Sequence, residues 1–170
     1  MAFRAAFMRP LRYGQVSGPE NAIQEYEASA SIVFSNVSGR FVALDASQQL
    51  IIGVAATTEL LGAVVQGGAY TGPTTAGRIV LPVNLSVDAV YLLPIAVSSI
   101  AASRTETQLK ALIGKTCDVI VASDIQYAAV DLSTRDVIQI VDYVVWGTGI
   151  GDQAVMVRLV PGKIGATGVV

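Results

Sequence analysis

The feature that most constrains the fold is a series of short β-branched and aromatic runs separated by turn-forming residues. Early runs occupy residues 32–34, 41–44 and 50–55, and residues 35–39 and 45–49 between them are rich in Ser, Asn, Asp and Gly. Such residues favour turns because their side chains bond locally to the backbone or because they tolerate left-handed conformations. Short strands at intervals of roughly 8–12 residues are typical of antiparallel β-sandwiches and small barrels. We therefore expect a mainly β fold, either a sandwich or a barrel.

The second half of the chain continues the same pattern. Gln139, Asp142 and Arg158 interrupt its apolar runs, so these strands should have one solvated face, as antiparallel sheets do. Pro82 and Pro94 lack the backbone N–H that a ladder needs, and we expect them to bound strands. The further strands are expected at residues 60–66, 78–81, 89–93, 117–122, 125–130, 137–146 and 154–160.

One short helix is expected after residue 102. Ser103 and Glu106 have the spacing of a capping box, in which each side chain bonds to the other's backbone N–H. Glu106 and Lys110 can pair one helical turn apart, and Gly114 suits the end of a helix. The apolar stripe of this helix would be Leu109, Leu112 and Ile113.

Charge is scarce in this chain. It has 170 residues, of which 52% are hydrophobic, with eleven Lys and Arg and thirteen Asp and Glu. An average soluble domain of this length carries about 42 charged residues. Such a composition supports a sizeable core but leaves wide stretches of surface neutral or apolar. We therefore expect part of that surface to lie against other protein, in a homo-oligomer and against a partner.

The two ends of the chain differ from its centre. Residues 1–24 are expected to form an extended N-terminal arm, residues 25–160 a single β-rich domain, and residues 161–170 a loose tail. In the arm, Pro and Gly break any regular period, while aromatic and arginine residues are the types that anchor interfaces. The predicted partner contacts of the arm are Phe3, Arg4, Phe7, Arg9, Arg12 and Tyr13.

Composition excludes several kinds of chemistry. The chain has no His, which removes His-dependent triads and nearly all zinc-site patterns. Its single Cys117 cannot form an intrachain disulfide, and without a His partner it is better explained as a buried apolar side chain. The net charge of −2 argues against general nucleic-acid binding. The arginines near the start interrupt any signal-like apolar run, and no membrane helix is expected.

Three patterns that suggest ligand sites do not hold on inspection. Residues 113–116 resemble a phosphate loop, but position 109 is Leu where the motif needs Gly, and the segment follows a helix. Residues 147–151 have the wrong glycine spacing for a dinucleotide loop and suit a hairpin. A group of carboxylates lacks the spacing of a calcium loop and fits turns or solvated faces: Asp118, Asp124, Asp131, Asp136 and Asp142. We therefore predict no catalytic residue, no cofactor and no metal.

The first 60 residues carry a resemblance to a known family. The chain begins Met-Ala-Phe, and residues 14–19 read Gly-Gln-Val-Ser-Gly-Pro. A Gly-Arg-Phe strand follows within residues 38–45, and an aliphatic strand with a central glycine occupies residues 50–55. This succession resembles the cement, or head-decoration, proteins of tailed bacteriophages.

The resemblance implies a non-enzymatic virion protein. Such a protein would be made in the bacterial host cytoplasm, form a trimer, and clamp neighbouring major capsid subunits from outside. An alternative is a carbohydrate- or ligand-binding β module, in which Tyr70 in the loop 67–77, or Trp146, would contact the ligand. A third is a glycosidase that uses two of the carboxylates, although no acidic pair lies in an apolar setting of its own.

Overall fold

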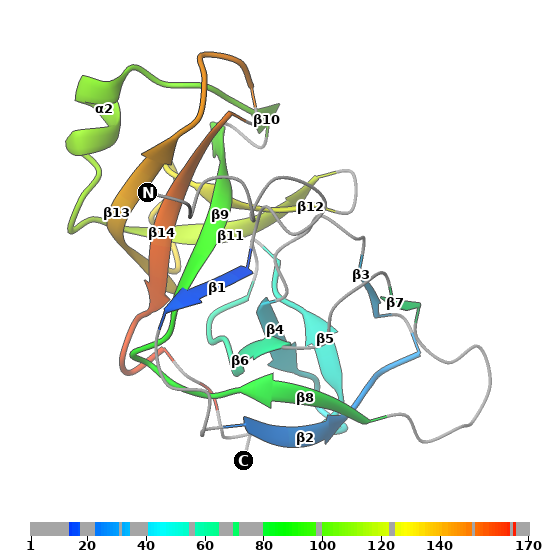
Figure 1. Cartoon of the computed structure of the whole chain (residues 1–170). Coiled ribbons are helices and arrows are strands. Elements are labelled where there is room, and N and C mark those ends of the chain that lie inside the picture. The colour runs from blue at the N-terminus through cyan, green and yellow to red at the C-terminus, as the bar shows by residue number, and fades with distance from the viewer. Residues whose placement is uncertain are drawn as a thin grey trace.

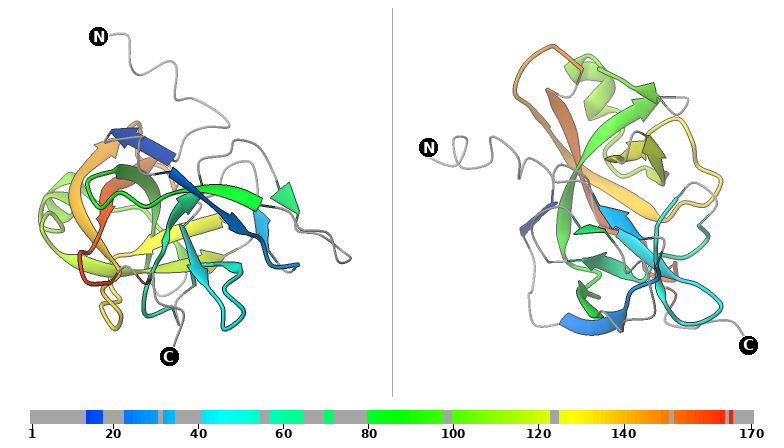
Figure 2. Two further views of the ribbon diagram at one scale, coloured as in Figure 1. Left: turned by 90° about the horizontal axis from the view of Figure 1, so that it is seen from below. Right: turned by 90° about the vertical axis from the view of Figure 1, so that its right-hand side faces the viewer.

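The computed structural model describes residues 14–17, 23–30, 32–34, 41–54, 57–64, 70–71, 80–97, 100–122, 125–150, 152–163 and 165. The chain is mainly β, as expected, and its strands gather at two ends of the molecule (Figures 1 and 2). Most of the second half of the chain forms the upper group of Figure 1, and the segment between residues 23 and 84 forms the lower group.

The strand pairings of the upper group close into a ring. The cycle runs β9–β12–β11–β13–β14 and returns to β9, with β9 and β12 parallel and the other pairs antiparallel. Strands β1 and β10 add to β9 outside this ring. The strands are β1 (Gly14–Ser17), β9 (Val90–Val97), β10 (Ile100–Ala101), β11 (Thr116–Ala122), β12 (Ile125–Ala129), β13 (Ile138–Val145) and β14 (Gln153–Leu159). This part of the molecule is therefore a small barrel.

The lower group is a curled five-stranded sheet in the order β2-β8-β6-β4-β5. A parallel bridge between Ala28 and Leu50 links its two outer strands, so the sheet wraps round a core of its own that includes Val42, Leu61 and Val83. Its strands are β2 (Ile23–Glu27), β4 (Phe41–Leu44), β5 (Leu50–Ile52), β6 (Gly62–Val64) and β8 (Val80–Asn84). The remaining pair is β3 (Val33–Phe34) with β7 (Tyr70–Thr71), and β7 lies in the segment expected to be a loop.

The two prolines expected to bound strands lie inside strands instead. Pro82 is in β8 and Pro94 is in β9. The β6–β8 pairing ends at Val64↔Val83, one residue before Pro82, and the β14–β9 pairing ends at Ala154↔Pro94. On the other side of β9, β1 pairs as far as Leu92 and β12 begins at Ile95. Pro94 therefore lies where the β14–β9 ladder ends, and Pro82 lies where the β6–β8 ladder ends. On its other side Pro82 faces Glu25 within the β2–β8 ladder, as a pair that needs no N–H from the proline.

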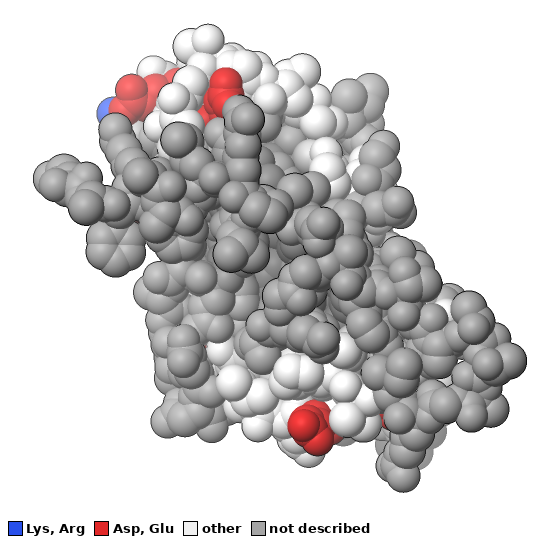
Figure 3. All heavy atoms as spheres, turned by 45° about the vertical axis from the view of Figure 1, so that its right-hand side comes forward, with Lys and Arg blue, Asp and Glu red and all other residues white. Residues whose placement is uncertain are grey.

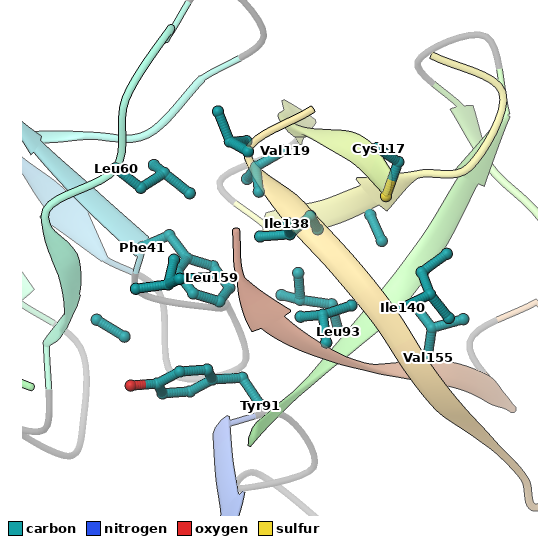
Figure 4. Close-up of a cluster of buried hydrophobic side chains, with 14 of the residues drawn as sticks. Phe41, Leu60, Tyr91, Leu93, Cys117, Val119, Ile138, Ile140, Val155 and Leu159 are labelled. Carbon is teal, nitrogen blue, oxygen red and sulfur yellow. The ribbon is translucent and has the colours of Figure 1, made fainter. Parts of the chain in front are cut away.

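A shared core joins the two groups. Phe41 and Leu60 of the lower group point toward Leu93, Ile138 and Leu159 of the barrel (Figure 4). The Phe41 ring meets the ring of Tyr91 edge-on, with centroids 5.0 Å apart. This apolar cluster therefore contains residues from both groups of strands, beside the separate core of the lower sheet.

The helix α2 (Glu106–Lys110) begins two residues later than expected. A capping box is present, but Thr105 is the N-cap and Gln108 its partner, rather than Ser103 and Glu106. The cause lies outside the helix: Gln153 of β14 accepts a hydrogen bond from the Arg104 N–H and donates to its carbonyl, both at 2.6 Å. This holds Arg104 outside the helix, so the helix starts after it.

The rest of this segment is as expected apart from Ile113. Leu109 and Leu112 are buried, and Glu106 and Lys110 form an ion pair at 3.3 Å. Gly114 ends the segment in a left-handed conformation with φ of 85°. Ile113, expected in the apolar stripe, is exposed because the regular helix stops at Lys110.

The beginning of the expected loose tail is attached to the lower group. The Leu60 N–H donates to the Lys163 carbonyl at 2.9 Å, and the Gly165 N–H donates to the Leu60 carbonyl at 3.2 Å. Residues 166–170 lie outside the described part of the chain.

Candidate functional site

The six predicted arm contacts precede the first described strand. Phe3, Arg4, Phe7, Arg9, Arg12 and Tyr13 all lie outside the described residues. The strand that follows them, β1, pairs with β9 through Gly14↔Leu92 and Gln15↔Tyr91. Part of the segment expected to be an extended arm is thus an added strand of the barrel sheet.

The carboxylates considered as ligands have local structural partners. One oxygen of Asp118 accepts the N–H groups of Arg135 and Asp136, both at 2.8 Å. Asp136 in turn accepts the hydroxyl of Thr116 at 2.7 Å. Asp118 lies in β11, within the strand expected at residues 117–122, but it is buried rather than in a turn or on a solvated face, and from there it orders the β12–β13 connection. Asp142 is exposed and bonds to the N–H of Tyr143, while Asp124 lies outside the described residues.

Within the described part of the chain, no three Cys, Asp or Glu residues come close enough to hold a metal ion. The only cysteine, Cys117, is buried, and burial together with the nearby Asp118 and Asp136 raises the pKa of its thiol to about 12. That thiol is therefore protonated at neutral pH and a poor nucleophile.

The two glycine-rich motifs have the structural roles expected of them. The Gly114 N–H donates to the Ile140 carbonyl, so the motif that resembles a phosphate loop is fixed against β13. In the β13–β14 hairpin, the Trp146 N–H donates to the Asp152 carbonyl, and the Asp152 carboxylate accepts from the Gly149 N–H at 3.2 Å. These glycines therefore serve turns between strands.

Of the two aromatic residues in the alternative carbohydrate site, Trp146 is half-buried at the start of the β13–β14 turn and Tyr70 is in β7. Asn84, which with Leu85 and Ser86 matches the N-glycosylation pattern, is fully buried, and its side-chain oxygen accepts a hydrogen bond from the Ser86 N–H. None of the described helices is long and apolar enough to cross a membrane.

Two glutamines that the sequence did not single out, Gln126 and Gln153, are buried and bind backbone groups of other segments. Gln126 of β12 is 2% exposed; its oxygen accepts the Phe41 N–H at 2.7 Å, and its amide nitrogen donates to the carbonyls of Phe41 and Gly53 at 2.8 and 2.9 Å. Its side chain thus joins the barrel to the lower sheet in the way a strand edge would. Gln153 of β14 likewise binds both the N–H and the carbonyl of one residue, Arg104, in the segment that precedes α2. The alternation of polar and apolar residues in β12 and β14 does not predict these buried contacts. A glutamine among apolar residues of a strand is normally assigned to the solvent-facing side.

One buried hydroxyl, that of Tyr91, is unusual among the described residues. Tyr91 is 4% exposed, and its oxygen has no hydrogen-bond partner in the described part of the molecule. Burial raises the pKa of this phenol well above its usual value. The ring is held by the shared core, so we assign Tyr91 a packing role.

Exposed apolar side chains, which are candidates for partner contacts, lie in both groups of strands. Six large apolar side chains are exposed among the described residues: Ile23, Val54, Val80, Ile113, Val145 and Ile150. Ile23 and Val80, at 44% and 43%, lie on the ribbon formed by β2 and β8, where cross-strand pairing puts Glu25 opposite Pro82 and Glu27 opposite Val80. We call Ile23, Glu25, Glu27, Val80 and Pro82 the β2–β8 face.

Charged side chains are few on the visible described surface. Figure 3 shows one face of the molecule, on which the described acidic side chains lie toward its two ends and the other described atoms belong mainly to uncharged residues. Comparisons with protein-family models, with curated proteins and with solved structures found no match.

Proposed function

We propose that this protein is a structural virion component, a cement or decoration protein, that binds the outside of a phage capsid and stabilises contacts between major capsid subunits. It acts without catalysis and as a homo-oligomer, in our proposal a trimer. The single observation that carries the proposal is a poorly charged chain with large apolar side chains exposed on its described surface. Large neutral areas suit a subunit whose surface is mostly in contact with other proteins in the assembled state.

The construction of the body supports the same role. Its buried polar side chains Gln126, Gln153 and Asp118 are engaged in binding backbone groups, which fixes the strands and turns relative to one another. The arm residues add aromatic and arginine side chains ahead of β1, and these are the types that dominate binding energy at interfaces. A rigid body with an interface-rich extension is suited to bridging neighbouring subunits.

Co-sedimentation with assembled heads tests the proposal. The full chain should pellet with heads of the phage that encodes it and should raise the temperature at which those heads lose their contents. Unrelated heads are the control. Saturating amounts of protein that leave both head binding and head stability unchanged would contradict a cement role.

Oligomeric state and catalysis are tested separately. Sedimentation equilibrium at micromolar concentration should give a multiple of the 17.7 kDa chain mass, and a clean monomer would contradict the oligomer. Turnover of a glycan, ester or nucleotide that is abolished by changing one Asp would contradict a non-enzymatic role.

A further inference from the structure

Among the described residues, no strand pairs with the outer edge of β2 along most of its length. This strand pairs with β8 along residues Ile23–Glu27, and its described contacts with β5 on the other side are confined to its C-terminal end, at the Ala28–Leu50 bridge and the Gln49–Glu27 hydrogen bond. Pro82 lies opposite Glu25 and has no N–H, so this pair cannot be a hydrogen-bonded pair. The backbone groups of Ile23, Glu25 and Glu27 therefore point away from β8, along the outer edge.

The side chains beside this edge are apolar and acidic. The exposed Ile23 and Val80 provide apolar surface, and the exposed Glu25 gives negative charge next to Glu27. An edge with these acids disfavours pairing with the same edge of another copy, because like charges would face each other. It favours an extended segment that is basic and apolar.

The chain contains one such segment. Residues 1–13 hold Arg4, Arg9 and Arg12 and no acidic residue, interleaved with Phe3, Phe7 and other apolar side chains. The described residues, in contrast, hold eleven of the thirteen acidic residues and only six of the eleven Lys and Arg. The two parts of the chain therefore have complementary charge.

Length also fits. The thirteen residues ahead of β1 could reach roughly 40 Å when extended, and those before Pro10 contain no proline that would interrupt a ladder. An extended segment added to a sheet edge gains affinity from main-chain hydrogen bonds and specificity from alternate side chains.

We propose that the outer edge of β2 binds residues 1–13 of a second copy of this chain as an added β-strand, with the side chains of the β2–β8 face beside it. The inference rests on the oligomer in the proposed function and identifies the contact that would build it. The arm of one subunit is then fixed on the body of the next, with arginines near Glu25 and Glu27 and aromatic rings near Ile23 and Val80.

Charge reversal in the full chain tests this contact without capsids. Glu25→Lys should weaken self-association in sedimentation equilibrium by about tenfold or more, since it places like charges together at the contact. Asp142→Lys, the same change at an exposed barrel site, is the matched control and should associate as the wild type does. Equal association of Glu25→Lys and wild type would overturn the proposal.

Disulfide trapping distinguishes which copy supplies the arm. Full-length Glu25→Cys is mixed with Ala2→Cys, Ala5→Cys or Ala6→Cys protein, and the buried Cys117 does not compete. A covalent dimer on a non-reducing gel with at least one arm position supports the proposal. No dimer with any of the three overturns it, as does a Glu25→Cys/Ala5→Cys double variant that forms only an internal bond. Head binding by the wild type remains an independent readout, so either result leaves the cement role to its own test.

Discussion

Replacing Gln126 should show how strongly one side chain holds the two parts of the molecule together. In Gln126→Leu the buried Phe41 N–H and the Gly53 carbonyl lose their partner, while the Phe41 carbonyl keeps its bond from the Gly53 N–H at 2.9 Å. A buried polar group left unsatisfied costs about 1–3 kcal/mol. The expected loss is therefore about 2–5 kcal/mol, which for a chain of this size lowers Tm by roughly 5–15 °C.

Gln126→Glu gives a sharper test because its effect depends on pH. A carboxylate can accept the Phe41 N–H but would face two carbonyl oxygens and has no proton to donate to either. Burial and these oxygens should raise the folded-state pKa of the introduced carboxyl group above its unfolded value of about 4.3. Below that value the acid is neutral in both states and the penalty is smallest. As pH rises toward the folded pKa, stability relative to wild type should fall by about 1.4 kcal/mol per pH unit.

Urea unfolding at pH 4 to 8 measures this slope. The matched control is Gln24→Glu on β2, where the side chain is exposed and the slope relative to wild type should be near zero. If Gln126→Glu has the stability of the control at every pH, then the amide of Gln126 does not make the contacts assigned to it.

Buried groups and the helix cap give three further predictions. Cys117 should react with a thiol reagent at pH 8 only as fast as the chain unfolds, because burial raises its pKa to about 12; rapid labelling of the native protein would contradict this. Tyr91→Phe should keep or raise Tm by removing a hydroxyl that has no partner in the described structure. In the wild type, the raised folded-state pKa of Tyr91 means that deprotonation above about pH 10 favours the unfolded chain. Tyr91→Phe should therefore lose less stability than the wild type above this pH. Thr105→Ala should cost about 1 kcal/mol in urea unfolding through loss of the N-cap, whereas Ser103→Ala should cost little; equal effects would argue against Thr105 as the cap.

The strands could be predicted because local chemistry determines them. The segments 41–44, 117–122, 125–130 and 137–146 coincide closely with β4, β11, β12 and β13, since each is a β-branched run bounded by turn residues. The closure of the upper strands into a barrel could not be predicted, because it depends on pairings between strands distant in sequence, such as the parallel pair of β9 and β12.

The errors have a common physical cause. Spacing alone favours a helix cap at Ser103, but Gln153, almost fifty residues later, holds Arg104 outside the helix. Local chemistry favours the prolines at strand ends, but both lie inside strands, and it is the β6–β8 and β14–β9 ladders that end beside them. In each case a tertiary contact decides between local options of similar energy. The contacts proposed for the arm stay predictions, since those residues lie outside the described structure.

The arrangement of charge connects the fold to the proposed assembly. An open strand edge is an aggregation hazard in a chain with few charges, because little else on the surface keeps copies apart. Glu25 and Glu27 lie on the β2 edge, so identical edges repel each other while a basic segment is attracted. If that segment is the arm of another copy, the same two carboxylates both prevent edge-to-edge pairing and select the intended contact. This contact should then weaken as salt rises toward 1 M, where the Debye length falls to about 3 Å, whereas association through the apolar surface alone would not.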